Sequence, residues 1–325
     1  MVTQPILKIS HLSSSFKSGH NYVKVVDDLS LHINPGEVVG LVGESGSGKT
    51  VTALSILQLS NCLLEGSIEL NKHELIGMKQ EELRNIRGKK IGIIFQEPMS
   101  SLNPVFTIGK QIAEVIENHE KISHKQASLK AISLLENVGI SQPDIRYHEY
   151  PHQMSGGMCQ RVMIAMAIAC QPQLLIADEP TTALDVSIQS QIITLLKDLK
   201  KQYNMSILLI THDLGIVAQL ADRVAVMYAG QIVEDAPIKE FIKKPEHPYT
   251  LGLIKSLPGK HKHGEKLFSI PGTVPNPLSW PNGCHFHPRC SYVEDQCKVN
   301  NPCLFEVSPG RQSRCFFAGR LPDEK

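Results

Sequence analysis

The segment Gly43–Thr50 constrains the fold of this chain more than any other. Its sequence, GESGSGKT, fits the pattern G-x-x-x-x-G-K-[ST]. It follows the apolar run VVGLVG, which predicts a buried strand, and it precedes VTALSILQL, which predicts a helix. Glycines in such a loop let backbone amides wrap a phosphate group, while the start of the helix presents its positive dipole end to the same anion. We therefore predict an α/β unit that binds the phosphates of a nucleotide.

Each position of this phosphate loop has an expected task. Lys49 should reach the β- and γ-phosphates, and Thr50 should bind Mg²⁺. The other six positions should surround the phosphates: Gly43, Glu44, Ser45, Gly46, Ser47 and Gly48. Taken alone, the loop indicates a nucleotide and leaves the reaction open.

Two adjacent acidic residues, Asp178 and Glu179, end a second apolar run, QLLIADEP. A carboxylate at the tip of a strand can hold the Mg²⁺ shell, and its neighbour can orient or deprotonate an attacking water. Paired acids are a poor structural choice at the end of a buried strand, because burying charge is costly. The pair therefore predicts nucleotide hydrolysis, with a solvated turn as the alternative.

Five short apolar runs predict the buried strands of a mostly parallel sheet covered by helices. They are Val38–Gly43, Ile91–Phe95, Gln173–Asp178, Ser206–Thr211 and Val224–Ala229. The stretch from roughly Ile108 to Ala169 has apolar residues at helical spacing and predicts an inserted helical layer. From about residue 236 proline becomes frequent and the periodicity fades. We therefore predict two domains, 1–235 and 236–325.

The composition limits the class of protein. In 325 residues, 33 Lys and Arg against 32 Asp and Glu give a formal net charge of +1, which argues against nucleic acid as a partner. The longest apolar run, Val162–Cys170, is far shorter than the ~20 residues that cross a bilayer. The start, MVTQPILKIS, lacks the layout of a signal peptide. We expect a cytosolic chain that does not span a membrane.

Further motifs give the chain a family resemblance. MSGGMCQR, at Met154–Arg161, resembles the signature motif of the ATP-binding-cassette (ABC) ATPases. Gln96, the segment Ala183–Asp185 and His212 resemble that family's Q-loop, D-loop and switch histidine. The motifs stand in the family's order over about residues 5–235.

The resemblance implies a particular fold and assembly. The fold is a P-loop ABC ATPase core, in which a mostly parallel sheet is joined by an antiparallel β subdomain and by a helical subdomain at about residues 97–165. The assembly is a head-to-tail pair of ATPase subunits. Ser155, Gly156 and Gly157 open a helix, so their free amides form a second anion site. In the family such a site serves the nucleotide held by the partner's phosphate loop.

The resemblance also assigns roles around the nucleotide held by this chain's own loop. Gln96 joins Thr50 and Asp178 in holding Mg²⁺ and takes part in catalysis. His212 senses the γ-phosphate and helps hold Glu179 and the attacking water in place.

One aromatic residue near the N-terminus should contact the base. Phe16, or alternatively Tyr22, occupies the region where the family stacks a ring on adenine. An ordinary edge-strand aromatic is the other interpretation of Phe16.

Three segments narrow the resemblance to one branch of the family. FQEPMSSLNPVFTIGKQI, the signature motif and HPYTLGLIKSLP (His247–Pro258) resemble importers of oligopeptides, dipeptides and nickel, and the tail GCHFHPRCSY resembles the peptide importers. The branch implies an ATPase on the cytoplasmic face of a bacterial membrane that energises di- or oligopeptide import. Its partners would be a second, homologous ATPase subunit, two permeases and an external peptide-binding protein. A nickel or other small-solute importer, a soluble ABC ATPase and a metal- or redox-sensing regulator are the alternatives.

Five of the eight cysteines fall in the last 42 residues, and in a reducing cytosol such a group suggests a metal more than disulfides. Four thiolates without C-x₂-C spacing are compatible with an iron–sulfur cluster. The resemblance implies a [4Fe–4S] cluster held by Cys284, Cys290, Cys297 and Cys315. Cys303 stands where the branch more often has proline and is left out. Zinc, with His285 or His287 as ligands, and free thiols are the alternatives.

Overall fold

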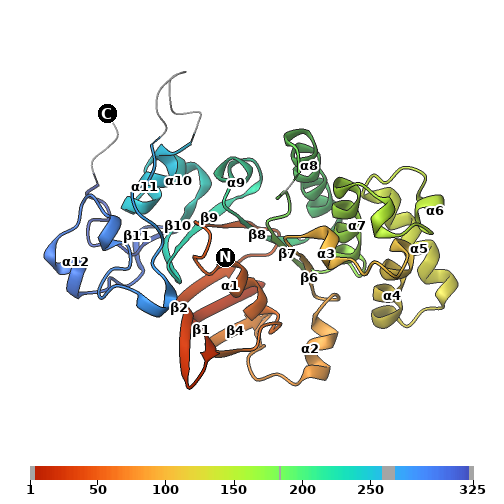
Figure 1. Cartoon of the computed structure of the whole chain (residues 1–325), viewed down its shortest axis with the longest axis horizontal. Helices are drawn as coiled ribbons and strands as arrows, with labels where there is room; N and C mark the ends of the chain where they lie inside the picture. The colour runs from red at the N-terminus through yellow and green to blue at the C-terminus, as the bar shows by residue number, and fades with distance from the viewer. Residues whose placement is uncertain (1–3, 183, 258–267, 322–325) are drawn as a thin grey trace. The chain divides into compact units, whose positions relative to one another are not determined.

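The computed structural model describes residues 4–182, 184–257 and 268–321 (Figure 1). The chain divides into two compact units. Unit 1 consists mainly of Asn34–Gly36 and Gly77–Ile210. Unit 2 contains Pro5–Ile33, Glu37–Ile76 and the C-terminal part from Thr211. Each unit is therefore assembled from segments that are far apart in the sequence, and the two are described separately.

Unit 1 is built on three parallel strands, β6 (Ile91–Ile94), β7 (Leu174–Asp178) and β8 (Ser206–Thr211). β7 is the middle strand of the three, and β7 and β8 are buried at every position. Their sequences are runs of Leu, Ile and Ala without polar alternation, as expected for strands covered on both faces. These three strands confirm the corresponding runs predicted from the sequence.

The predicted helical stretch of unit 1 is confirmed. The stretch contains α4 (Ile108–Glu120), α5 (His124–Asn137) and α7 (Gly156–Ile168), and α8 (Val186–Tyr203) is a further long helix of the unit outside that stretch. Side chains from Thr107 and Ser123 accept amide hydrogen bonds at the starts of α4 and α5. The shorter helices are α2 (Gln80–Ile86), α3 (Pro98–Ser101), α6 (Pro143–Arg146) and η1 (Pro151–Gln153).

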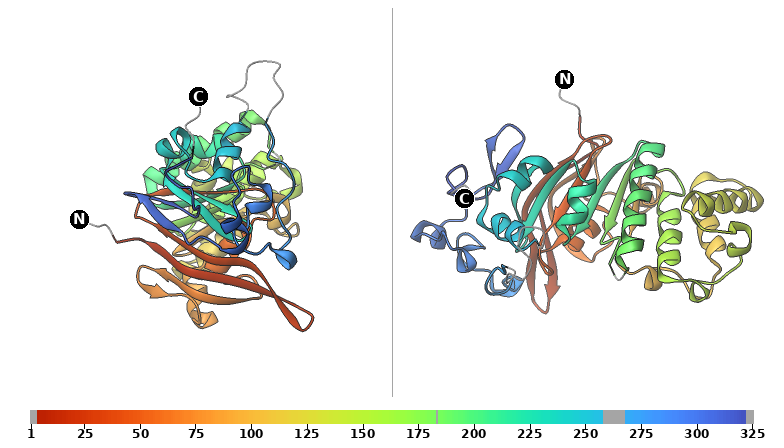
Figure 2. Two further views of the ribbon diagram at one scale, coloured as in Figure 1. Left: turned by 90° about the vertical axis from the view of Figure 1, so that its left-hand side faces the viewer. Right: turned by 90° about the horizontal axis from the view of Figure 1, so that it is seen from above.

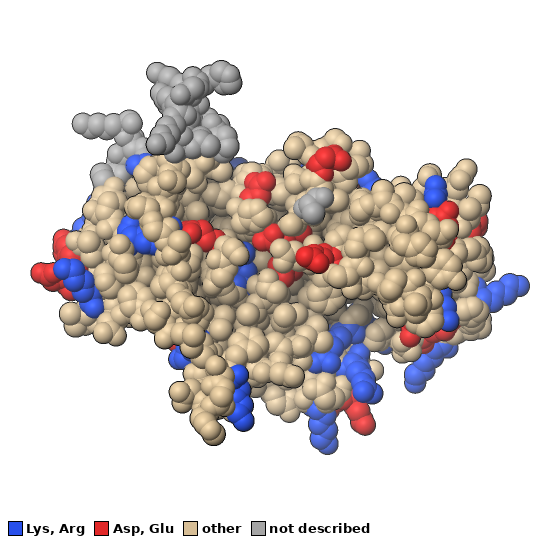
Figure 3. All heavy atoms as spheres, in the orientation of Figure 1, with Lys and Arg blue, Asp and Glu red and all other residues tan. Residues whose placement is uncertain are grey.

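Charged side chains of both signs are scattered over the face drawn in Figure 3, and Lys and Arg gather around α2. The exposed basic residues there are Lys79, Arg84, Lys89 and Lys90. This local group stands beside Glu81 and Glu82, in keeping with the balanced net charge of the whole chain. None of the helices in the described parts of the chain is long and apolar enough to cross a membrane.

Unit 2 contains an antiparallel sheet in the order β2-β1-β4-β5. Its strands are β1 (Leu7–Ser18), β2 (Asn21–Ile33), β4 (Cys62–Leu70) and β5 (His73–Glu74). The helix α1 (Lys49–Ile56) packs on this sheet, and the hydroxyls of Ser14 and Ser55 hydrogen-bond at 2.9 Å between β1 and α1. The antiparallel β part of the predicted fold is thereby confirmed.

A second set of strands in unit 2 begins with β3 (Val38–Val42), which pairs in parallel with β9 (Arg223–Tyr228). The antiparallel order β9-β10-β12-β11 then continues to the C-terminal part, so that the blue strands lie beside the cyan ones in Figure 2. The added strands are β10 (Gln231–Pro237), β11 (Phe305–Ser308) and β12 (Arg311–Ser313). β10 runs across residue 236, and the domain boundary placed there from the sequence stays a prediction.

Short helices complete unit 2. They are α9 (Leu214–Leu220), α10 (Ile238–Lys243), α11 (Pro248–Lys255), η3 (Pro277–Ser279), η4 (His287–Arg289) and α12 (Asp295–Val299). Tyr249 of α11 and Phe241 of α10 are among the largest fully buried side chains. The residues after 236 thus contribute to the core of the unit that also holds the phosphate loop.

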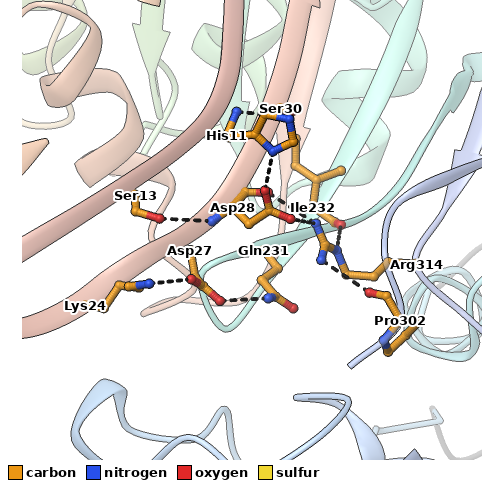
Figure 4. Close-up of polar contacts among 10 residues, drawn as sticks. All are labelled: His11, Ser13, Lys24, Asp27, Asp28, Ser30, Gln231, Ile232, Pro302 and Arg314. Carbon is orange, nitrogen blue, oxygen red and sulfur yellow. Dashed lines mark hydrogen bonds and ion pairs between the residues drawn. The ribbon is translucent and has the colours of Figure 1, made fainter. Parts of the chain in front are cut away.

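Arg314, which follows β12, attaches the C-terminal part to β2 (Figure 4). Its guanidinium donates to the carboxylate and the backbone carbonyl of Asp28 and to the carbonyl of Ile232. Burial alone would raise the pKa of Asp28, but hydrogen bonds from His11 and Arg314 lower it. The two segments are therefore held together by a charged contact between residues 286 positions apart.

A second buried guanidinium, Arg223, lies where β9 begins. Its Nε donates to Glu37 at 2.8 Å, and its terminal nitrogens donate to Asp235 and to the carbonyl of His32. Asp235 is only 4% exposed, and burial raises its pKa while Arg223 opposes that rise. Without Arg223 the carboxylates of Glu37 and Asp235 would lose their shared counter-charge.

We therefore expect Arg223→Met to lower the free energy of unfolding by about 3–5 kcal/mol, because it leaves Asp235 buried and unpaired. Arg146→Met is the matched control, since Arg146 pairs with Glu149 at a partly exposed position of unit 1. Loss of the Arg146–Glu149 pair should lower the free energy of unfolding by less than about 1 kcal/mol. Urea unfolding of both variants measures the difference, and equal losses would contradict the assignment.

Candidate functional site

The phosphate loop joins β3 to α1 in unit 2 and lies directly against the end of β9. A Cβ on Gly43 would stand 2.1 Å from the carbonyl oxygen of Met227. Gly48 has φ +104°, and a Cβ there would stand 2.8 Å from Met227 Cε and 3.0 Å from the carbonyl oxygen of Val25. Only glycine fits at both positions, because any side chain would push the loop off the strand.

Lys49 and Ser47 line the inner side of the loop. The Lys49 ammonium donates to the carbonyl oxygens of Gly43 and Glu44 at 2.7 and 3.0 Å. The Ser47 hydroxyl is buried and has no hydrogen-bond partner among the described residues. Thr50, by contrast, is exposed at the start of α1. A cationic side chain folded over the loop and a buried hydroxyl without a partner fit a site for phosphate oxygens.

Glu44 is held by residues that the sequence did not indicate. Its backbone N–H donates to the Tyr249 hydroxyl at 3.0 Å, and its carboxylate accepts from Arg289 at 3.0 and 3.2 Å. Tyr249 lies on α11 and Arg289 at the end of η4, both beyond residue 236. No local sequence motif predicted these two contacts.

His212 follows β8 and is exposed. Together with Gly43, Glu44 and Ser45 of the loop it lines a cavity of about 400 Å³ in unit 2. Leu253 of α11 lines the same cavity. The structure thus brings the predicted switch histidine next to the phosphate loop.

The candidate base-stacking residue also lies in unit 2. Phe16 of β1 is half-buried and stands opposite Val23 of β2 and Cys62 of β4. Tyr22 is 59% exposed on the neighbouring strand. Which ring contacts a base stays a prediction.

Unit 1 holds the paired acids at the end of β7. Asp178 is 4% exposed, and Glu179 has a backbone φ of +47°. A left-handed conformation is rare for glutamate and costs of order 1 kcal/mol. The Glu179 carboxylate accepts from Thr182 Oγ1 at 2.7 Å and from Gln96 Nε2 at 3.4 Å. The structure therefore brings Gln96 and Glu179 together, and it adds Thr182, which the sequence had not singled out.

The signature motif opens α7 in the same unit. Ser155 is the N-cap, and its hydroxyl accepts the Met158 N–H at 3.3 Å. Ser155 and Gly156 are exposed, whereas a Cβ on Gly157 would stand 3.1 Å from Ile188. A helix start with exposed amides fits the predicted second anion site.

The D-loop is described only in part, because Ala183 lies outside the described residues. Asp185 is the N-cap of α8 and accepts hydrogen bonds from the Ile188 N–H and the Ser187 hydroxyl. These hydrogen bonds lower the pKa of the exposed Asp185 carboxyl.

Three other C-terminal cysteines contribute to the pKa of Cys315. Burial, with a smaller contribution from Cys284, Cys290 and Cys297, raises the pKa of Cys315 to about 12. The sulfur atoms of Cys290 and Cys315 accept the N–H groups of the residues two positions later, at 3.3 and 3.4 Å. Cys303 is exposed and has no part in this group.

The predicted metal site is not confirmed by this geometry. Within the described ranges 4–182, 184–257 and 268–321, no three His, Cys, Asp or Glu side chains are grouped so that they could hold a metal ion. Cys284 and Cys297 are adjacent through their backbones, since the Cys284 N–H donates to the Cys297 carbonyl at 2.9 Å.

Comparison with known proteins places these features in a family. Residues 26–182 match the model of the ABC transporter family, and residues 233–297 match the family described as oligopeptide/dipeptide transporter, C-terminal region. The oligopeptide transport ATP-binding protein AppD of Bacillus subtilis (strain 168) is 49% identical over 316 residues, which cover 96% of each chain. The chain belongs to the ABC transporter family. The resemblance drawn from the sequence motifs is thereby confirmed.

Solved structures of ABC proteins share the fold. The ATP-binding cassette MJ0796, in a dimeric post-hydrolysis state bound to ADP and Pi, is 27% identical with a TM-score of 0.65. The match covers 71% of this chain and 98% of that one. The cbiO1 protein of Clostridium perfringens, part of the ABC transporter complex cbiONQ, is 25% identical with a TM-score of 0.63, over 77% of this chain and 95% of its own. The predicted α/β P-loop ABC ATPase fold is confirmed.

Proposed function

We propose that this ABC protein is the ATP-hydrolysing subunit of a bacterial importer of di- or oligopeptides. The observation that carries its nucleotide-binding part is the phosphate loop, which lies against β9 with Lys49 folded over it and with a Ser47 hydroxyl that has no hydrogen-bond partner in the described part of the chain. The relative AppD, an oligopeptide transport ATP-binding protein, is similar over nearly its whole length. An importer of nickel or another small solute is the second candidate within the same branch.

Residues of unit 2 would bind the nucleotide. The amides of the phosphate loop and the Lys49 ammonium would neutralise the β- and γ-phosphates. His212, beside the loop in the same cavity, would contact the γ-phosphate. Phe16 is the proposed stacking partner of the adenine, because it lies on β1 in the sheet that packs on α1.

Residues of unit 1 would activate the attacking water. The Glu179 carboxylate, held by Thr182, would accept a proton from that water or orient it, with Gln96 beside it. Asp178 and Gln96 would hold Mg²⁺, which would neutralise the charge on the phosphate oxygens. Both side chains present the oxygen donors that Mg²⁺ prefers.

The signature motif supports action as a pair of subunits. Ser155, Gly156 and Gly157 would contact the γ-phosphate of a nucleotide held by a second, homologous ATPase subunit. Ser155 and Gly156 are exposed, as such an intermolecular role requires. The MJ0796 cassette, similar in fold, is dimeric.

Replacing Glu179 tests the hydrolytic role. We expect Glu179→Gln to bind ATP normally and to hydrolyse it at least about 100-fold more slowly, because the amide cannot accept the proton. Glu136→Gln, an exposed acid on α5, is the matched control and should hydrolyse at the wild-type rate. ATP turnover measured by phosphate release decides the point, and near-wild-type turnover of Glu179→Gln would remove Glu179 from the mechanism.

The transport function requires partners at a membrane. We propose two permeases, a second ATPase subunit and an external peptide-binding protein, with this chain bound at the cytoplasmic face. We also propose the domain division 1–235 and 236–325, with a helical subdomain at about 97–165. The match of residues 233–297 to the oligopeptide/dipeptide family supports a separate C-terminal part.

Co-purification tests these partners. Tagged protein extracted from membranes in mild detergent should bring down two permeases and a second ABC subunit, identified by mass spectrometry. Recovery of ribosomes or DNA without a permease would overturn the transporter assignment and favour a soluble ABC ATPase. The ligand captured by the binding protein encoded beside the permeases would then separate peptide import from nickel import.

We also propose that Cys284, Cys290, Cys297 and Cys315 hold a [4Fe–4S] cluster. Support comes from the backbone N–H groups that donate to the sulfur atoms of Cys290 and Cys315. Such hydrogen bonds stabilise sulfur that carries negative charge, as iron-bound thiolate does. The bound cluster would crosslink the C-terminal part, which has no disulfide among its described residues.

Iron content tests this assignment. Protein purified without oxygen should absorb broadly near ~400 nm and contain iron, because thiolate-bound clusters have charge-transfer bands there. Cys290→Ser and Cys315→Ser should lose the absorbance, whereas the exposed Cys303→Ser serves as the control and should keep it. Colourless protein with stoichiometric zinc would overturn the choice of iron.

A further inference from the structure

The segment that carries the cysteines contacts the phosphate loop directly, and all of the residues concerned belong to unit 2. Arg289 precedes Cys290 and donates through Nη1 to both carboxylate oxygens of Glu44. The side chain of Arg289 is only 6% exposed, while that of Glu44 is 32% exposed. A charge-assisted contact thus joins the C-terminal part to the second residue of the loop.

The position of the Arg289 guanidinium is set by its other partners. Nε donates to the Pro271 carbonyl at 2.8 Å, and Nη2 donates to the Ile270 carbonyl at 3.3 Å. Nη1 also lies 3.4 Å from the Tyr228 hydroxyl. With backbone acceptors on one side and Glu44 on the other, the guanidinium has a defined orientation.

A buried aromatic group supports the same contact. Tyr249 accepts the Glu44 N–H and packs on Tyr228 with ring centroids 4.6 Å apart. Phe286 packs on both tyrosines, at 5.1 and 5.4 Å. Because Phe286 lies between Cys284 and Cys290 in the sequence, the turn that bears these cysteines and the phosphate loop share one packed core.

We infer that Arg289 is a positioning residue of the nucleotide site, acting through Glu44. The inference rests on the proposed function, since it takes the loop to bind the phosphates of ATP. The carboxylate of Glu44 would repel a triphosphate, and Arg289 neutralises it and holds it in one orientation. The backbone of Glu44 is fixed at the same time, because its N–H donates to the Tyr249 hydroxyl and its carbonyl oxygen accepts from Lys49. The C-terminal part is in this way a component of the ATP site.

Binding of ATP in EDTA, which prevents hydrolysis, tests the inference on the full chain by calorimetry. Arg289→Gln should weaken ATP binding about threefold to fivefold, because it leaves the Glu44 carboxylate without its counter-charge. Arg289→Lys keeps the positive charge and should therefore lose less ATP affinity than Arg289→Gln. Arg311→Gln is the matched control, since Arg311 is equally buried in the C-terminal part but faces Glu234, Glu240 and Glu246.

Two readouts separate positioning through Glu44 from a loss of packing. Adding Glu44→Gln to Arg289→Gln should restore ATP affinity to within about twofold of the wild type, because the repulsive charge is gone. The defect of Arg289→Gln should also shrink at high salt, since screening weakens repulsion between partly exposed charges. A packing defect would respond to neither change.

The outcomes are distinct. Failure of the wild-type chain to bind ATP would overturn the proposed function itself. Wild-type binding with an unaffected Arg289→Gln, or with a defect that neither Glu44→Gln nor salt relieves, would overturn the role of Arg289 alone. An Arg289→Lys variant that binds as weakly as Arg289→Gln would also contradict it, because charge would then not be the cause.

Discussion

The close approach of the phosphate loop to the end of β9 is the constraint on which unit 2 depends. No Cβ fits at Gly43 or Gly48 beside Met227, so the loop has one available path around the site. The Ser47 carbonyl also accepts the Gly230 N–H, which ties the loop to the turn between β9 and β10. The shape of the loop is therefore determined jointly by glycines within it and by the distant backbone of Met227 and Gly230.

The same turn is where the C-terminal part attaches. Nδ1 of His285 lies 2.8 Å from the carbonyl oxygen of Ala229. The ring of Trp280 covers Gly230 and leaves no room for a Cβ on that glycine. Arg289 and Arg314 donate hydrogen bonds to the carboxylates of Glu44 in the phosphate loop and of Asp28 in β2. Buried guanidinium groups require such counter-charges, so the C-terminal part cannot shift without leaving charge unpaired.

The candidate catalytic residues depend on a different constraint, the end of β7. Asp178 is the last residue of an apolar strand that is buried on both faces, and Glu179 follows it, so both acids lie at the end of the parallel strand. The left-handed backbone of Glu179 is maintained by a 2.8 Å hydrogen bond from its N–H to the Ile210 carbonyl. Thr182 and Gln96 then orient the carboxylate. A strained residue held by several neighbours is typical of a reactive position.

The sequence by itself determined the local elements and their chemistry. The runs around Val38, Ile91 and Leu174 could be predicted as strands, and the phosphate loop and signature motif could be recognised, because each depends on residues adjacent in the chain. Only the tertiary structure decided that Arg289 and Tyr249 hold Glu44 and that Thr182 holds Glu179. The contacts of Arg289 and Tyr249 with Glu44 join residues more than 200 positions apart, and they leave no periodicity or motif in a single sequence because they arise only when folding brings the two segments together. The contact of Thr182 with Glu179 is local, but it depends on the backbone conformation of the turn after β7.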